Sequence, residues 1–151
     1  MTATITLLAN ATNYNGSIAV DIFDRGQTVY SRKEFNEGPN QIEFNVNWPT
    51  TVSIITSNRN PKDTVCDSNG IIVNNKCLEV TGISINQFAI HMDLVDKMFH
   101  CQRNGHTDIV NANFWDFNGQ IQMHLTHNSP MRFMLSLQNQ FDVNRLMWNN
   151  Q

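Results

Sequence analysis

The sequence predicts an all-β protein, an antiparallel β-sandwich or jelly roll with little helix, from three observations. Apolar residues take every second position in many runs, as Ile42, Phe44 and Val46 do between polar neighbours. The runs are short, and turn pairs such as Asn15-Gly16 and Asn69-Gly70 separate them. Convincing helical spacing is absent from most of the chain. We therefore expect one domain, with a β-sandwich over 1–138 and a C-terminal tail over 139–151 that docks on the body or on a neighbour.

Each predicted strand rests on alternation of apolar and polar positions or on a short apolar run between turn residues. In chain order, these strands lie near 5–7, 18–23, 28–30, 42–46, 52–55, 71–73, 78–80, 83–94, 121–125 and 131–137. The 83–94 run has two mixed faces, so we expect it to change partners along its length. Helix is expected only near 93–99 and in the tail after Gln140.

Charge and hydropathy exclude two classes of partner. Charged residues make up 15% of the 151 residues, the net charge is −3, and Lys and Arg are scattered. A nucleic-acid-binding face would need clustered basic residues, so we expect no nucleic acid. No apolar run approaches the roughly 20 residues of a membrane helix, so we expect no membrane insertion.

Amide side chains supply most of the polarity, because Asn and Gln together make up about a fifth of the chain. Neutral amides suit docking on protein or on sugar hydroxyls, since they donate and accept hydrogen bonds without the desolvation cost of a charge. A coding bias towards Asn explains the same composition equally well. The composition leaves both explanations open.

The first residues and the cysteines indicate the cellular compartment in which the protein is made. Residues 1–11 lack a positively charged start and have a short apolar stretch, so we interpret them as a strand rather than a signal peptide. Cys66 and Cys77 flank a hairpin-like stretch and are either paired across it or reduced, and Cys101 stands apart. Reduced thiols are expected for a protein assembled in a cytosol.

One polar loop, 58–67, offers metal chemistry. Asn58, Asp63 and Asp67 supply amide and carboxylate oxygens, the ligands that calcium prefers. The same Asp side chains also cap turns by accepting bonds from their own backbone. The loop is therefore either a calcium site or a set of capped turns, and its spacing does not follow the EF-hand pattern.

Aromatic residues are the candidate contact residues. Trp115, Phe117, Tyr14 and Trp148 either anchor the core or, where exposed, contact a glycan or a protein partner. Catalytic signatures are missing, since the chain has no Gly-x-Ser-x-Gly turn and no phosphate loop. Cys101 beside His100 offers a nucleophile and a base, but nothing in the sequence orients them. We therefore expect no enzyme.

The segments 52–58, 76–80 and 83–86, together with Asp63 and Asp67, resemble the calcium-dependent xylan-binding type of carbohydrate-binding module. The resemblance covers at most the first 90 residues and implies a jelly-roll sandwich with calcium beside a glycan site. The chain carries Cys77 and Leu78 where that family tends to have an acidic or amide pair.

The whole chain also resembles the small, Asn-rich β-sandwich proteins of tailed-phage virions. This resemblance implies a non-enzymatic capsid decoration or tail-associated protein in a virion assembled in the host cytoplasm. It would need no cofactor and would dock on copies of itself and on other virion proteins. The alternative function is a carbohydrate-binding module that binds a host-surface glycan with calcium.

Overall fold

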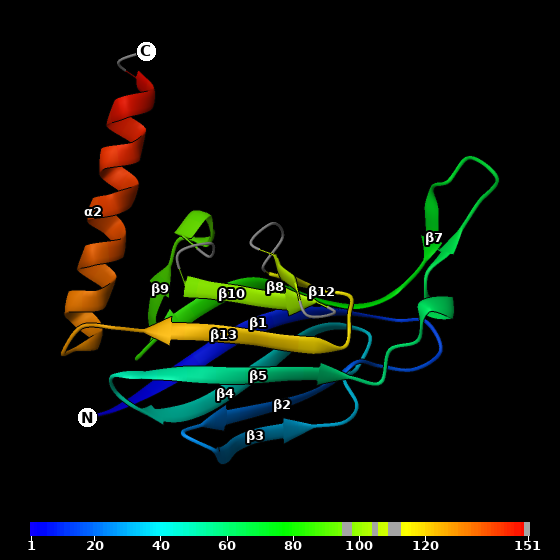
Figure 1. Ribbon diagram of the computed structural model, residues 1–151, viewed down its shortest axis with the longest axis horizontal. Helices are drawn as coiled ribbons and strands as arrows, with labels where there is room; N and C mark the ends of the chain where they lie inside the picture. Colours follow the sequence, from blue (N-terminus) through cyan, green and yellow to red (C-terminus); the bar gives the residue numbers. More distant parts are fainter. Residues whose placement is uncertain (95–97, 104–105, 109–112, 150–151) are drawn as a thin grey trace.

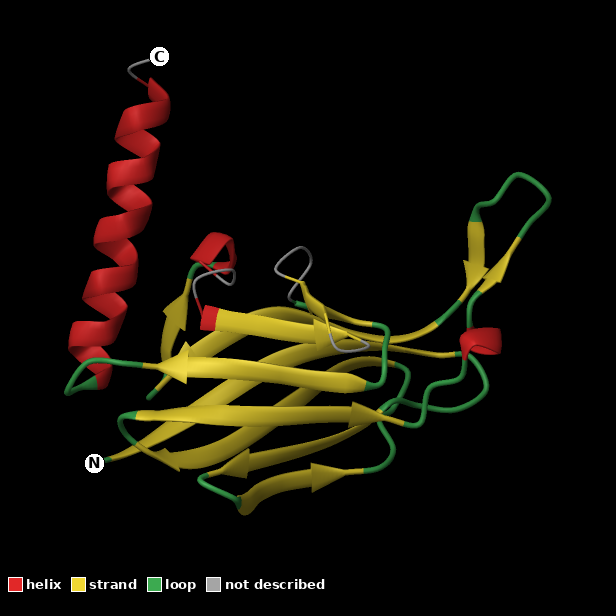
Figure 2. Cartoon of the chain, viewed as in Figure 1, coloured by secondary structure: helices red, strands yellow, loops and turns green. Residues whose placement is uncertain are grey.

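The computed structural model confirms the predicted antiparallel β-sandwich, with two sheets packed face to face (Figures 1 and 2). The structure describes residues 1–94, 98–103, 106–108 and 113–149. All pairs of neighbouring strands within this part of the chain are antiparallel. Within the same residues, no helix has the length and hydropathy of a membrane span.

The first sheet is built around β1 (Thr2–Asn13). The strands β4 (Gly38–Asn47) and β8 (Lys76–Ile85) pair with its two edges. Two short strands, β9 (Phe88–Ile90) and β12 (Phe114–Trp115), pair with different parts of the far edge of β8. The polar outer face of this sheet is open to solvent over β4, β1 and β8.

The second sheet contains six strands, and its central pair joins β13 to β5. The strand order is β11 (His106–Asp108), β10 (Phe99–Arg103), β13 (Gly119–Leu125), β5 (Thr50–Ser57), β2 (Ala19–Asp24) and β3 (Gln27–Arg32). The predicted strands at 18–23, 28–30, 52–55 and 121–125 are therefore confirmed.

The core lies between the sheets because alternate side chains of each strand point inward. In β1 the residues Ala3, Ile5 and Leu7 are fully buried, and in β5 the residues Val52 and Ile54 are fully buried. Burying one large aliphatic side chain contributes about 1.5–3 kcal/mol, so these inward rows stabilise the packing of the two sheets.

The polar loop leads into a hairpin that projects from one end of the sandwich, while the C-terminal helix projects from the other end (Figure 1). A 3-10 turn, η1 (Pro61–Asp63), precedes β6 (Val65–Cys66) and β7 (Ile72–Asn74), which pair with each other. Cys66 is exposed, Cys77 and Cys101 are buried, and all three are free thiols. The reduced alternative for the cysteines thus describes this structure.

The predicted strand at 131–137 is wrong, because these residues begin the helix α2 (Pro130–Asn149). Phe133 and Leu137 are buried, whereas Met131 and Leu135 are exposed. On a helix, residues four apart share a face, so Phe133 and Leu137 lie on the buried face and Met131 and Leu135 lie on the opposite face. The alternation of apolar residues in the sequence therefore indicated a strand where the chain forms a helix. Ser129 caps the helix through a bond from the backbone N–H of Arg132, 3.2 Å. The expected division at residue 138 falls inside this helix.

The single strand expected over 83–94 is also wrong. The strand β8 ends at Ile85, and β9 folds back onto it after a two-residue turn at Asn86 and Gln87. Both turn residues have positive φ values, 49° and 72°, as a tight type I′ hairpin requires. A 3-10 turn, η2 (Met92–Leu94), follows in the region where helix was expected.

Candidate functional site

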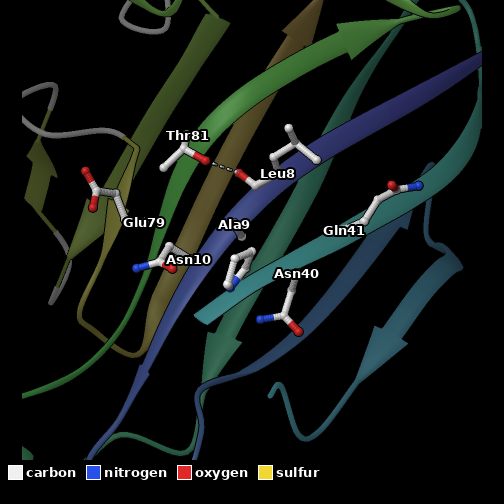
Figure 3. Close-up of a pocket in the computed structure, with 8 residues that line it drawn as sticks. Leu8, Ala9, Asn10, Asn40, Gln41, Glu79 and Thr81 are labelled. Carbon is white, nitrogen blue, oxygen red and sulfur yellow. Dashed lines mark hydrogen bonds between the residues drawn. The ribbon is translucent and has the colours of Figure 1, made fainter. Parts of the chain in front are cut away.

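A shallow open groove of about 500 Å³ lies on the outer face of the first sheet (Figure 3). We call it the outer groove. Its lining residues come from three neighbouring strands, β1, β4 and β8: Leu8, Ala9, Asn10, Pro39, Asn40, Gln41, Glu79 and Thr81. Because paired strands carry these residues, their backbone positions are fixed by the sheet.

Strand register places the groove residues in two rows. Asn10 lies opposite Pro39 on one side and opposite Glu79 on the other. Leu8 lies opposite Gln41 and Gly82, next to an irregularity in the pairing of β1 with β8. A Cβ atom on residue 82 would come within 3.1 Å of the Leu8 Cδ1 atom. Glycine at this position therefore leaves room for the Leu8 side chain to lie across β8.

The polar side chains of the outer groove differ in whether they form hydrogen bonds within the protein. Asn10, Gln41 and Glu79 are exposed, and their side chains make no hydrogen bond to any residue that the structure describes. Asn40, by contrast, donates to the carbonyl oxygens of Asn36 and Gly38, at 2.8 and 2.9 Å. Leu8 is 49% exposed and adds an apolar surface. Two amides and one carboxylate around an apolar strip suit a ligand with hydroxyl and C–H groups.

A second pocket, of about 380 Å³, holds Tyr14. It lies between the end of β1 and the strand β7, and it is lined by Thr12, Asn13, Tyr14, Glu37, Ile72, Val73, Asn74 and Asn75. Glu37 accepts a bond from the Asn13 backbone N–H at 2.7 Å, and the Tyr14 N–H donates to the Asn75 carbonyl at 3.1 Å. Tyr14 is half-buried, and among the predicted contact residues whose side chains the structure describes it is the only one that lines this pocket.

Two other predicted contact residues, Trp115 and Phe117, lie in the core. Trp115 is 0% exposed and meets Phe99 edge to face, with 6.3 Å between the ring centroids. Phe117 is also buried. Both belong to the core, so neither ring faces a glycan or a partner in this structure. Trp148 falls in the last turn of α2, and its side chain lies outside the part that the structure describes.

The predicted metal residue Asp63 forms a salt bridge with Lys76, a residue that the sequence pattern did not indicate. The Lys76 Nζ atom lies 3.1 Å from the Asp63 Oδ2 atom, and both side chains are only 5% exposed. Asp63 also accepts bonds from the Asn60 backbone N–H at 2.8 Å and from the Asn15 Nδ2 atom at 3.3 Å. The Asn60 N–H, together with Lys76 and Asn15, outweighs burial and lowers the pKa of the Asp63 carboxyl.

The other two predicted metal residues are engaged in turns. Asn58 donates from its side chain to the Ser17 carbonyl at 2.8 Å. The Asp67 Oδ1 atom accepts the backbone N–H groups of Asn69 and Ile71, at 2.8 and 3.0 Å. Within the described residues, no group of three His, Cys, Asp or Glu side chains is placed to hold a metal ion.

Two histidines that sequence spacing did not bring together meet on the outer face of the second sheet. The rings of His100 and His124 pack edge to face with centroids 4.6 Å apart, and the His124 Nδ1 atom lies 3.2 Å from the Thr51 hydroxyl. Burial, and to a smaller extent the His100 charge, lower the pKa of His124. The neighbouring strands β10 and β13 create this contact, which no spacing within one strand reveals.

Comparison with known proteins finds no matching family model and no matching curated protein. Two solved structures are similar in fold. One is described as vCBM60 in complex with galactobiose, with a TM-score of 0.50, 16% identity, and coverage of 80% of this chain and 97% of that chain. The other is the selenomethionine form of vCBM60, described in connection with two families of calcium-dependent carbohydrate binding modules. It has a TM-score of 0.50, 14% identity, and coverage of 84% and 98%. The fold of this chain is thus similar to that of carbohydrate-binding modules.

Proposed function

We propose that this protein is a non-catalytic carbohydrate-binding module that holds a neutral glycan in the outer groove. The observation that carries the proposal is the set of unengaged polar side chains, Asn10, Gln41 and Glu79, around the exposed Leu8. The fold similarity to carbohydrate-binding modules supports the same class of function. Together these observations favour the glycan alternative over the virion role predicted first.

The chemistry of the groove restricts the ligand. Amides donate to and accept from sugar hydroxyls, and Leu8 covers the C–H face of a sugar ring. Glu79 places a carboxylate at one side of the groove, and the chain carries a net charge of −3. Anionic glycans are therefore disfavoured, and neutral oligosaccharides of galactose or xylose are the first ligands to test.

The test is calorimetric titration with neutral galacto- and xylo-oligosaccharides, chosen after a glycan-array screen. Asn10→Ala and Glu79→Gln should each weaken binding about fivefold, a change of about 1 kcal/mol. The first variant removes a hydrogen bond, and the second replaces a charge-assisted hydrogen bond by a neutral one. Glu43→Gln is the matched control, because Glu43 is exposed on β4 but does not line the groove. It should leave the affinity unchanged.

Two outcomes would contradict this proposal. If no glycan on the array is retained, the binding function itself is wrong. If Tyr14→Ala removes binding while the two groove variants do not, the glycan site is the Tyr14 pocket instead.

A second candidate function is protein docking in a virion, and an apolar patch favours it. Phe88, Met131 and Leu135 are 61%, 59% and 57% exposed. They surround a pocket of about 260 Å³ between β9 and the first turns of α2. On this hypothesis copies of the protein and other virion proteins cover the patch. No comparison tests a virion origin, and it stays a prediction.

Light scattering after size-exclusion chromatography tests the docking function. A self-associating chain should lose its oligomer when Leu135→Lys places a charge in the patch. Ser31→Lys, at an exposed position of β3, should leave the oligomeric state unchanged. A chain that is monomeric at high concentration and does not co-purify with particles would contradict this second function.

A further inference from the structure

The polar loop that resembles a calcium site already binds a cation from the same chain, the Lys76 side chain at the start of β8. One of the two similar structures is described with calcium-dependent modules. The residues of this chain do not fit a calcium ion at Asn58, Asp63 and Asp67. We infer that the Lys76 ammonium group takes the place of a metal ion in this loop, and that the loop holds its shape without calcium. This inference is independent of the proposed glycan function.

The contacts of the Lys76 Nζ atom support this assignment. It lies 3.1 Å from the Asp63 Oδ2 atom and donates to the Asn58 carbonyl oxygen at 3.0 Å. The Gly16 backbone lies close above it, because a Cβ atom there would be 3.9 Å from Nζ. The ammonium therefore occupies the space between the two loop oxygens that a cation would otherwise bridge.

Three of the four carboxylate oxygens of Asp63 and Asp67 already accept hydrogen bonds. Calcium takes six to eight oxygen ligands at 2.3–2.6 Å. The Asp63 oxygens also accept from Asn60 and Asn15, so both are already engaged. Asp67 binds two N–H groups of its own turn. A calcium ion would have to displace these donors and bring its two positive charges beside a buried ammonium.

A second cationic side chain closes the same segment. Arg59 donates to the Lys76 carbonyl oxygen at 3.0 Å and to the Asn75 Oδ1 atom at 2.8 Å. The Arg59 guanidinium and the Thr64 hydroxyl are also hydrogen-bonded, and that hydroxyl donates to Asn75 at 2.9 Å. Two side-chain cations thus fasten the loop to the start of β8, where a metal ion would otherwise be needed.

The experiment measures the melting temperature of the protein and its calcium binding by calorimetry. The wild-type protein should melt at the same temperature in excess calcium and in excess chelator, and titration with calcium chloride should give no binding heat. Lys76→Met should lower the melting temperature by about 10 °C in both buffers, because it leaves the Asp63 carboxylate buried without its partner. The double variant Asp63→Asn with Lys76→Met should recover much of that loss.

Asp67→Asn is the matched control, since its carboxylate serves only the hairpin turn among the contacts described for it. It should melt alike in calcium and in chelator. The inference is overturned if calcium raises the wild-type melting temperature by several degrees, or if calorimetry finds one calcium per chain. Because both readings come from the wild-type protein, the test holds even if Lys76→Met fails to fold.

Discussion

Replacing Trp115 by alanine is expected to lower the free energy of unfolding by about 3–5 kcal/mol, a loss typical of a buried tryptophan. The ring is fully buried and contacts Phe99 from the opposite sheet. The Trp115 backbone in the short strand β12 lies opposite Leu78 of β8. Urea unfolding followed by circular dichroism measures the loss.

Trp115→Phe provides the control for this prediction, because it keeps an aromatic ring and should lose less stability than the alanine variant. The result also separates the two interpretations that the sequence left open for Trp115. An alanine variant that keeps full stability but loses glycan binding would make Trp115 a surface platform, and would contradict the core position described here.

Phe133→Ala is expected to release α2 from the sandwich and to cost about 3 kcal/mol. Phe133 is only 3% exposed and meets Trp48 at 5.4 Å between ring centroids, so it anchors the first turns of the helix. An isolated helix of this length is marginal in water, so the released segment should lose helical structure. The helical signal in far-UV circular dichroism should fall while the strand signal remains.

The control for α2 is Leu135→Ala, which removes an exposed leucine from the same turn of the helix. It should change neither the helical signal nor the stability by more than about 0.5 kcal/mol. A Phe133→Ala protein that keeps its full helical signal would show that the helix is stable without the contact to Trp48.

Alternation of apolar residues was enough to predict the sheets, because every second side chain of a half-buried strand points into the core, as at Ile42, Phe44 and Val46. The same rule failed at 131–137, where burial of Phe133 and Leu137 follows helical spacing. The signal that was available is the pair Ser129-Pro130, a helix cap followed by a proline suited to the first helical position. The turn at Asn86 was missed because neither residue of the Asn86-Gln87 pair is glycine.

The candidate sites were harder to predict because they depend on contacts between distant segments. Tyr14 was singled out as a contact residue; it lines a pocket, and its contact with a glycan or partner stays a prediction. Lys76 was not, since its partner Asp63 meets it only after the loop folds back on β8. The outer groove was missed because it needs the register that sets Asn10 against Pro39 and Glu79. A single strand gives the face of a residue but not its neighbours across the sheet.

The central place of β1 in its sheet has a consequence for how the chain reaches its native state. This strand precedes both of its neighbours in the chain, which begin at Gly38 and Lys76. A growing polypeptide on the ribosome therefore carries an apolar segment that can be paired on both sides only after β8, which ends at Ile85, has been made. Folds with such distant pairing typically refold in about milliseconds to seconds, and the unpaired strand is exposed to aggregation until its partners arrive.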